Sequence, residues 1–259
     1  MRIALGVEYA GSAFCGFQSQ PSRCGVQDAL EEAIGQIAGH SVGVVAAGRT
    51  DAGVHAVSQV VHFDTDAMRP DAAWVRGVNT HLPPSAAVLW SCLVAGEFHA
   101  RFAAAARHYT YVLLMRPERP GLFAGRVGWY HHQLDVGAMR DAAAALVGTH
   151  DFSSFRAAEC QAKSPVKTLW RADVSSDGAL VRFELSANAF LHHMVRNIVG
   201  ALVAVGSGKM PARWAGDLLA ARDRTQGAPT FAPDGLYFAG AEYDTRFGLP
   251  PTVRKVAVS

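Results

Sequence analysis

The 259-residue sequence is poor in charged residues, in lysine and in cysteine. Charged residues make up 18% of the chain and hydrophobic residues 50%, which is the balance of a folded protein rather than a disordered one. No apolar run approaches the roughly 20 residues that a membrane-spanning helix needs, and no signal-peptide pattern is present. We therefore expect a soluble, cytoplasmic protein, long enough for two modest domains.

Cysteine and histidine spacing favours no metal site. No two cysteines form the CxxC pair of a zinc knuckle, so free thiols in a reducing compartment are expected. The histidines lack an HExxH motif or other close ligand spacing. His192 and His193 are adjacent in a predicted helix, where successive side chains point about 100° apart. We predict no metal. The cysteines are Cys15, Cys24, Cys92 and Cys160.

The formal net charge of +2 is unevenly distributed. Residues 1–103 hold six Lys and Arg against nine Asp and Glu, whereas residues 104–259 hold 18 against 13. Only four of the cations are lysines, and 20 are arginines. Arginine suits phosphate because its planar fork donates two parallel hydrogen bonds. A GC-rich genome would produce the same bias, so both explanations stay open.

Strand and helix patterns predict two α+β halves. The first half has the order of a split βαβ sandwich, as in ferredoxin-like and RNA-recognition folds, and the second half repeats it. We expect two ferredoxin-like or RRM-like halves with antiparallel sheets, residues 1–104 and 105–259, meeting at a central catalytic cleft. The predicted strands are 2–8, 42–47, 56–64, 86–94, 106–115, 165–175, 179–187 and 236–243. The predicted helices are 26–39, 135–147, 189–205 and two beginning near Pro70 and Pro211.

One loop carries the chemistry that stands out. Ala47–Ala56 reads AGRTDAGVHA, between two predicted strands. Its glycines permit a tight turn, and Arg49 and Asp51 lie two residues apart between them. Catalytic groups are often held on such loops by a rigid sheet. An ordinary turn with a surface Arg–Asp pair fits the pattern equally well.

This string resembles the signature of the TruA family of pseudouridine synthases. Further strings in the same order are similar to that family and extend the resemblance over roughly residues 2–245. Phe17 stands where the family often has tryptophan, and both side chains are aromatic. The further strings are Phe14–Gln18, Gly77–Pro83, Phe98–Phe102, Arg107–Tyr111, Asp151–Phe155, Ala187–Gly200 and Gly235–Tyr237.

The resemblance implies an isomerase that converts uridine to pseudouridine in the tRNA anticodon stem-loop, at positions 38, 39 and 40, as a homodimer. It implies that Asp51 is the catalytic nucleophile and that no cofactor is needed. Arg196 would pair with Asp51, and Tyr109 would stack on the extruded base. Arg49 would fill the space of the flipped nucleotide or hold its phosphate, and Leu236 would line the uracil pocket. Without the resemblance, Arg196 fits a solvent-facing helix position, and Tyr109 and Leu236 fit plain core positions.

Two other functions compete with this interpretation. A non-catalytic protein with two RNA-recognition domains would carry an RNP1-type strand, and no predicted strand does. A carboxylate hydrolase acting on nucleosides or sugars would want a second acid near Asp51, and no paired acidic motif is evident.

The segment Gly206–Lys209 resembles a fragment of a phosphate-binding loop. Val203 occupies the position of that motif's first glycine, and Met210 the position of its Ser or Thr. The segment also follows a predicted helix instead of opening one. We interpret it as a helix C-cap.

Overall fold

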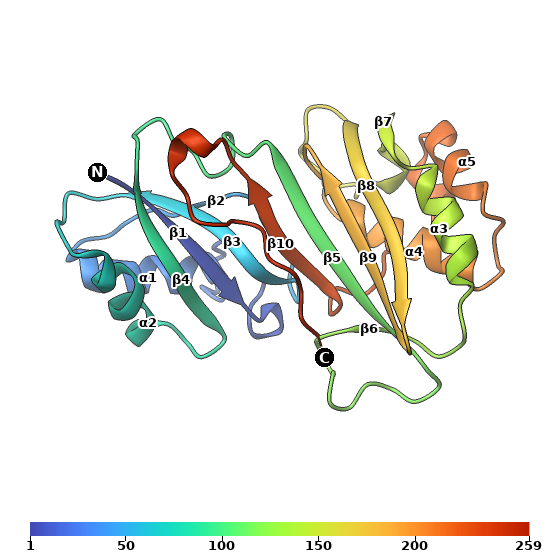
Figure 1. Cartoon of the computed structure of the whole chain (residues 1–259), viewed down its shortest axis with the longest axis horizontal. Coiled ribbons are helices and arrows are strands. Elements are labelled where there is room, and N and C mark those ends of the chain that lie inside the picture. Colours follow the sequence, from blue (N-terminus) through green and yellow to red (C-terminus); the bar gives the residue numbers. More distant parts are fainter. Residues whose placement is uncertain (259) are drawn as a thin grey trace. The chain divides into compact units, whose positions relative to one another are not determined.

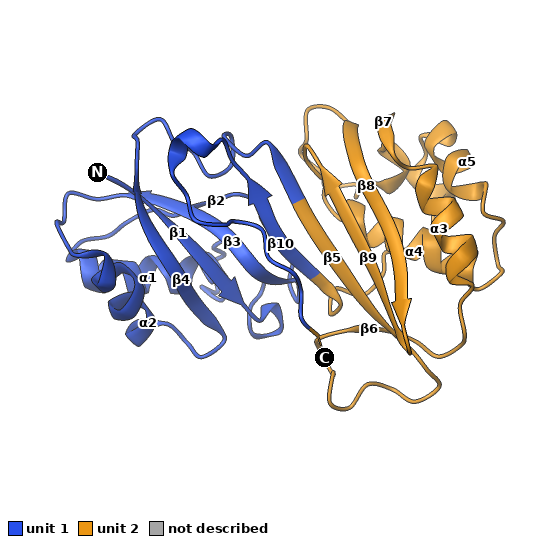
Figure 2. Cartoon of the chain, viewed as in Figure 1, with its two compact units in different colours: residues 1–107, 237–257 blue, residues 108–236, 258–259 orange. Residues whose placement is uncertain are grey.

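The computed structural model describes residues 1–258 and divides them into two compact units (Figure 2). Unit 1 is Met1–Arg107 with Tyr237–Ala257, and unit 2 is His108–Leu236 with Val258. The predicted second half, 105–259, includes Tyr237–Ala257, which in the structure lies in unit 1. The reason is a long-range pairing, since Tyr237 and Phe238 run parallel to His55 and Ala56. Within residues 1–258, no helix has the length and apolar character needed to cross a membrane.

Unit 1 is built on a mostly antiparallel sheet (Figure 1). Its strand order is β4-β1-β3-β10, and β2 pairs antiparallel with β3. Helices α1 and α2 pack against each other. This is the predicted split βαβ order, with β10 added parallel to β3. The elements are β1 (Arg2–Tyr9), α1 (Val26–Ala38), β2 (Val45–Ala46), β3 (His55–Asp64), a π-helix (Ala73–Gly77) that leads into α2 (Val78–His81), β4 (Ala86–Val94) and β10 (Leu236–Glu242).

Helix α1 forms where the apolar spacing predicted it. Val26, Leu30 and Ile34 recur on one face and are fully buried. The helix stops at Gly39, whose φ of 80° is left-handed and favours glycine. The predicted strand 42–47 is shorter in the structure, because only Val45 and Ala46 pair with β3.

Unit 2 has the sheet order β5-β9-β8-β7, with β6 parallel to β5. Helix α3 packs against β8 and against α4 and α5. The antiparallel α+β class predicted for this half is confirmed. The elements are β5 (Ala106–Met115), β6 (Gly128–Tyr130), α3 (Val136–Ala144), β7 (Gly148–Asp151), β8 (Val166–Asp177), β9 (Leu180–Ala187), α4 (Met194–Gly206) and α5 (Trp214–Ala221). Short 3₁₀ helices cover Gly11–Ala13, Ser153–Phe155, Arg224–Gln226 and Thr245–Phe247.

Helix α4 begins five residues later than predicted, at Met194 instead of 189. His193 has a left-handed φ of 60°, which interrupts the helical backbone before it. The prediction that His192 and His193 lie on the helix, pointing 100° apart, is therefore wrong. Their ring centroids lie 3.9 Å apart.

Candidate active site

The loop between β2 and β3, residues 47–54, presents the predicted carboxylate. Asp51 is half-buried and Arg49 is exposed, while Thr50 between them is buried. The Val54 N–H donates to the Asp51 carbonyl at 3.1 Å, and Gly53 takes a left-handed φ of 82°. The glycine at 53 is thus required by the turn that follows Asp51.

Buried polar side chains of β1 and β3 hold this loop in place through hydrogen bonds. The Thr50 and Tyr9 hydroxyls are 2.8 Å apart. The Gln59 amide donates to the Gly48 carbonyl at 2.7 Å and lies 3.4 Å from the Tyr9 hydroxyl. Burial raises the pKa of Tyr9 to about 12, so its hydroxyl stays protonated at neutral pH. The Gln59 Oε1 is buried and has no hydrogen-bond partner among residues 1–258. The bonds from Tyr9 and from the Gln59 amide nitrogen therefore hold the residues on both sides of Arg49.

A second loop, which includes residues 15–24, contacts the backbone next to Asp51. The Phe17 N–H donates to the Thr50 carbonyl at 2.9 Å. Gly16 has a φ of 102°, and a Cβ added to it would lie 3.1 Å from the Thr50 oxygen and 3.2 Å from the Ala52 nitrogen. Position 16 thus needs glycine both for its backbone conformation and for its contact with the Asp51 loop. This explains physically why Gly16 belongs to the string Phe14–Gln18.

A disulfide joins the two ends of this supporting loop. Cys15 and Cys24 are bonded, with their Cα atoms 5.4 Å apart, and the Cys15 N–H donates to the Cys24 carbonyl at 2.9 Å. The prediction of free thiols is wrong for this pair and confirmed for Cys92 and Cys160. Linear spacing of nine residues does not reveal the backbone pairing that brings the two sulfurs together.

The string Gly235–Tyr237 ends next to His55, the residue that follows the loop at residues 47–54. Tyr237 pairs with His55, and their rings stack with centroids 4.7 Å apart. The His55 Nδ1 accepts a hydrogen bond from the Gly11 N–H at 3.1 Å. Leu236, the predicted lining of the uracil pocket, is buried.

In unit 2, the predicted Arg196 is hydrogen-bonded to an irregular segment, residues 227–235. Arg196 is half-buried on α4, and its Nε donates to the Phe231 carbonyl at 2.7 Å. The Phe231 N–H donates back to the Arg196 carbonyl at 3.3 Å. The hydrogen bond to the Phe231 carbonyl therefore fixes the orientation of the Arg196 guanidinium. Tyr109 is half-buried on β5 and meets the Phe190 ring edge-on, with centroids 5.0 Å apart.

The residue after Arg196 clamps the same segment. Asn197 is buried, and its Oδ1 accepts from the Thr230 hydroxyl at 2.7 Å and from Arg224 at 3.1 Å. Its Nδ2 donates to the Phe155 carbonyl at 2.8 Å. An added Cβ at Gly200 would lie 2.5 Å from the Pro229 oxygen, so the segment also packs directly on α4. We had not predicted this clamp, although a lone amide on an otherwise apolar helix face signals one.

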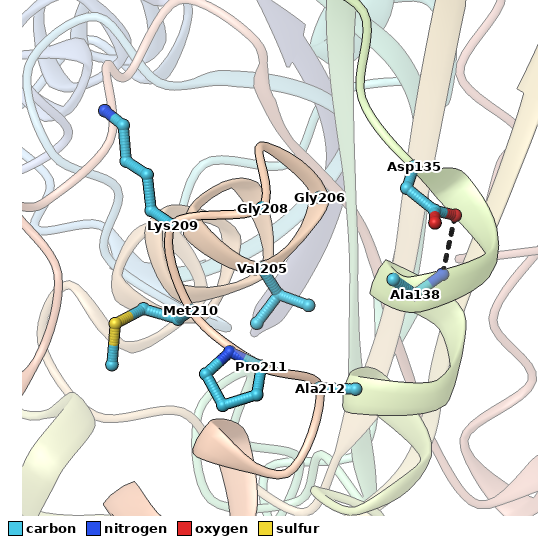
Figure 3. Close-up of a pocket in the computed structure, with 9 residues that line it drawn as sticks. All are labelled: Asp135, Ala138, Val205, Gly206, Gly208, Lys209, Met210, Pro211 and Ala212. Carbon is cyan, nitrogen blue, oxygen red and sulfur yellow. Dashed lines mark hydrogen bonds between the residues drawn. The ribbon is translucent and has the colours of Figure 1, made fainter.

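A pocket at the C-terminal end of α4 has no comparable chemistry (Figure 3). Lys209 and Met210 line it, and the Asp135 carboxylate caps α3 by accepting from the Ala138 N–H at 2.9 Å. Gly208 has a φ of 73° just after the helix end. The predicted helix C-cap is confirmed, and the segment opens no helix that could bind phosphate.

Comparisons with known proteins agree with the order of motifs. The family model described as tRNA pseudouridine synthase matches residues 6–103 and 142–244. The tRNA pseudouridine synthase A of Methylobacillus flagellatus is 58% identical over 258 residues, covering 100% of this chain and 99% of that protein. The enzymes of the same name from Chromobacterium violaceum and Thiobacillus denitrificans are 63% and 59% identical, each covering 96% of both chains. The chain therefore belongs to the tRNA pseudouridine synthase family.

Proposed function

We propose that this chain isomerises uridine to pseudouridine in the anticodon stem-loop of tRNA, at positions 38, 39 and 40. The observation that carries the proposal is the loop at residues 47–54. It presents the half-buried carboxylate of Asp51 on a rigid, hydrogen-bonded support, in a chain that belongs to the tRNA pseudouridine synthase family.

The reaction needs a nucleophile and no imported group. The N1–C1′ bond of uridine breaks, the ring turns, and a C5–C1′ bond forms. The proton on C5 is released and N1 takes up a proton, so atoms and electrons balance without a redox cofactor or ATP. Asp51 supplies the nucleophile and holds one fragment covalently while the ring turns. The carboxylate forms its bond either to the sugar or to the uracil ring.

The other predicted residues surround this step. We propose that Arg196 pairs with Asp51, because a cation stabilises the ionised carboxylate that nucleophilic attack requires. Tyr109 stacks on the extruded uracil, and its hydroxyl assists removal of the C5 proton. Arg49 takes the place of the flipped nucleotide or binds its phosphate. Leu236 forms an apolar wall of the uracil pocket.

The substrate is expected to be gripped mainly through shape and phosphate contacts. A stem offers little sequence information to a protein, so base reading contributes little. Binding then weakens steeply as salt rises, because phosphate contacts release counterions. We propose that the active form is a cytoplasmic homodimer in which both subunits hold one tRNA.

Release of tritium from uridine C5 tests the proposal. The full chain is incubated with unmodified tRNA labelled at C5, and label in water is measured against pseudouridine mapped by position. We expect release equal to the pseudouridine formed, at positions 38, 39 and 40. Binding without release would favour a non-catalytic RNA-binding protein. Release of free uracil would favour a hydrolase, and pseudouridine elsewhere would refute the assigned positions.

A further inference from the structure

An exposed aromatic side chain lies on the connection between β4 and β5. Phe102 is 76% exposed. Its ring stacks on His99 with centroids 4.3 Å apart and planes 30° apart. The guanidinium carbon of Arg101 lies 5.6 Å from the centre of the Phe102 ring. We call His99, Arg101 and Phe102 the Phe102 platform.

Side chains from outside the connection between β4 and β5 hold its backbone in place, both before the platform and within it. Arg2 donates to the carbonyls of Gly96 and Phe98 at 2.6 and 2.7 Å. The Tyr243 hydroxyl donates to the Ala100 carbonyl at 2.6 Å. Phe98 itself is fully buried. The connection is therefore held by these hydrogen bonds and by the buried Phe98 ring, while the Phe102 side chain is exposed to solvent.

Two imidazoles fix the backbone of the platform. The His99 Nδ1 accepts from the N–H groups of Arg101 and Phe102, each at 3.2 Å. The His62 Nδ1 accepts from the Ala100 N–H at 3.1 Å. These bonds need neutral rings. Burial lowers the pKa of His62 to about 4 and also lowers the pKa of His99, so both rings are neutral at physiological pH.

Arg107 joins the platform to the loop that carries Asp51. Its Nη2 donates to the carbonyl of Arg101 and, at 3.3 Å, to the carbonyl of Ala47. Ala47 begins the loop at residues 47–54. The exposed side chains of Arg49 and Arg101 therefore belong to neighbouring segments of unit 1, and both suit a polyanion.

We propose that the Phe102 platform stacks a base of the RNA substrate, one that flanks the uridine being isomerised. This inference rests on the proposed function. A single exposed phenylalanine is ordinary on a protein surface. The backbone N–H of Phe102, however, is hydrogen-bonded to His99, and its ring stacks on His99 and lies next to Arg101. Every base has a π-face, so stacking tolerates any sequence. One phenylalanine is too small an apolar area to carry a dimer interface, which takes about 1,200–2,000 Å² in total.

The test compares three variants of the full chain with a matched control. Phe102→Ala removes the ring, Phe102→Leu keeps an apolar side chain without a π-face, and Phe102→Tyr keeps the ring. Leu122→Ala is the control, because Leu122 is 87% exposed in unit 2. The probe is an anticodon stem-loop RNA with 2-aminopurine at each position flanking the target in turn, and tRNA affinity is measured over a range of salt.

We expect one flanking 2-aminopurine to be quenched by the wild type and by Phe102→Tyr, and not by Phe102→Ala or Phe102→Leu. Loss of the ring should weaken tRNA binding by about 5- to 150-fold. Because the ring is neutral, the slope of affinity against salt should not change. If Phe102→Ala binds tRNA and quenches 2-aminopurine as the wild type does, the proposal that Phe102 stacks a base is refuted, even if tritium release continues. Altered sedimentation of Phe102→Ala would instead assign the side chain to contact between copies, which also overturns it. Absence of tritium release in the wild type would refute the proposed function separately.

Discussion

Gly16→Ala tests whether the backbone of the Asp51 loop controls the reaction. Gly16 has a φ of 102°, where a non-glycine residue costs about 1–2 kcal/mol of folding free energy. Its new Cβ would also lie 3.1 Å from the Thr50 oxygen and 3.4 Å from the Asp51 carbonyl carbon. The loop must therefore shift by a few tenths of an ångström. Since a misplacement of about 1 Å can cost about 100-fold in rate, we expect kcat to fall about 3- to 6-fold.

Gly39→Ala is the matched control for backbone strain. Gly39 has a φ of 80° at the end of α1, and nothing lies within 4 Å of an added Cβ. Both variants should lower Tm by about 2–8 °C, whereas only Gly16→Ala should lower kcat in single-turnover tritium release. Equal kcat in the two variants would refute the idea that Gly16 positions Asp51.

Three further outcomes are expected. Asn197→Ala removes the hydrogen bonds of its buried amide to the Phe155 carbonyl and the Thr230 hydroxyl, so it should cost about 2–4 kcal/mol in urea unfolding and expose the segment 227–235 to limited proteolysis. Reducing the Cys15–Cys24 disulfide should lower the free energy of unfolding by about 2–3 kcal/mol, and a Cys15→Ser, Cys24→Ser double variant should show no response to reductant. Because burial lowers the pKa of His62 from 6.5 to about 4, the unfolded chain binds the extra proton between these values. Stability present above pH 6.5 should therefore be lost as pH falls toward 4, and His62→Asn should weaken this dependence in denaturation midpoints.

Much of the fold follows from local patterns in the sequence. The predicted strands 86–94 and 106–115 have the bounds of β4 and β5, and the predicted helix 26–39 differs from α1 by one residue. Apolar spacing sufficed there because each element buries one face against a core. The start of α4 could not be placed, because the left-handed backbone of His193 has no pattern in its neighbours.

Pairings between strands that are far apart in the chain could not be predicted from local sequence patterns. The segment Tyr237–Ala257 lies in unit 1 because β10 pairs with β3, some 180 residues away by number. Strands β6 and β7 were missed because they have only three and four residues, too few to show a period.

The sequence predicts the loop that carries Asp51, but it does not predict the side chains that hold this loop in place. The string around Asp51 and its resemblance to a family predict a functional loop at residues 47–54, and these residues form a turn between β2 and β3. Tyr9 and Gln59, which hold that loop, lie on β1 and β3 and look like ordinary strand residues. The roles of Asp51, Arg49, Tyr109, Arg196 and Leu236 stay predictions.

Single-turnover tritium release by Asp51→Asn tests the central claim most directly. Asp66→Asn is the control, because the Asp66 side chain is 96% exposed in the same unit. Asp51→Asn should bind tRNA and release no label, while Asp66→Asn should match the wild type. Wild-type release by Asp51→Asn would contradict the assignment of Asp51 as the nucleophile.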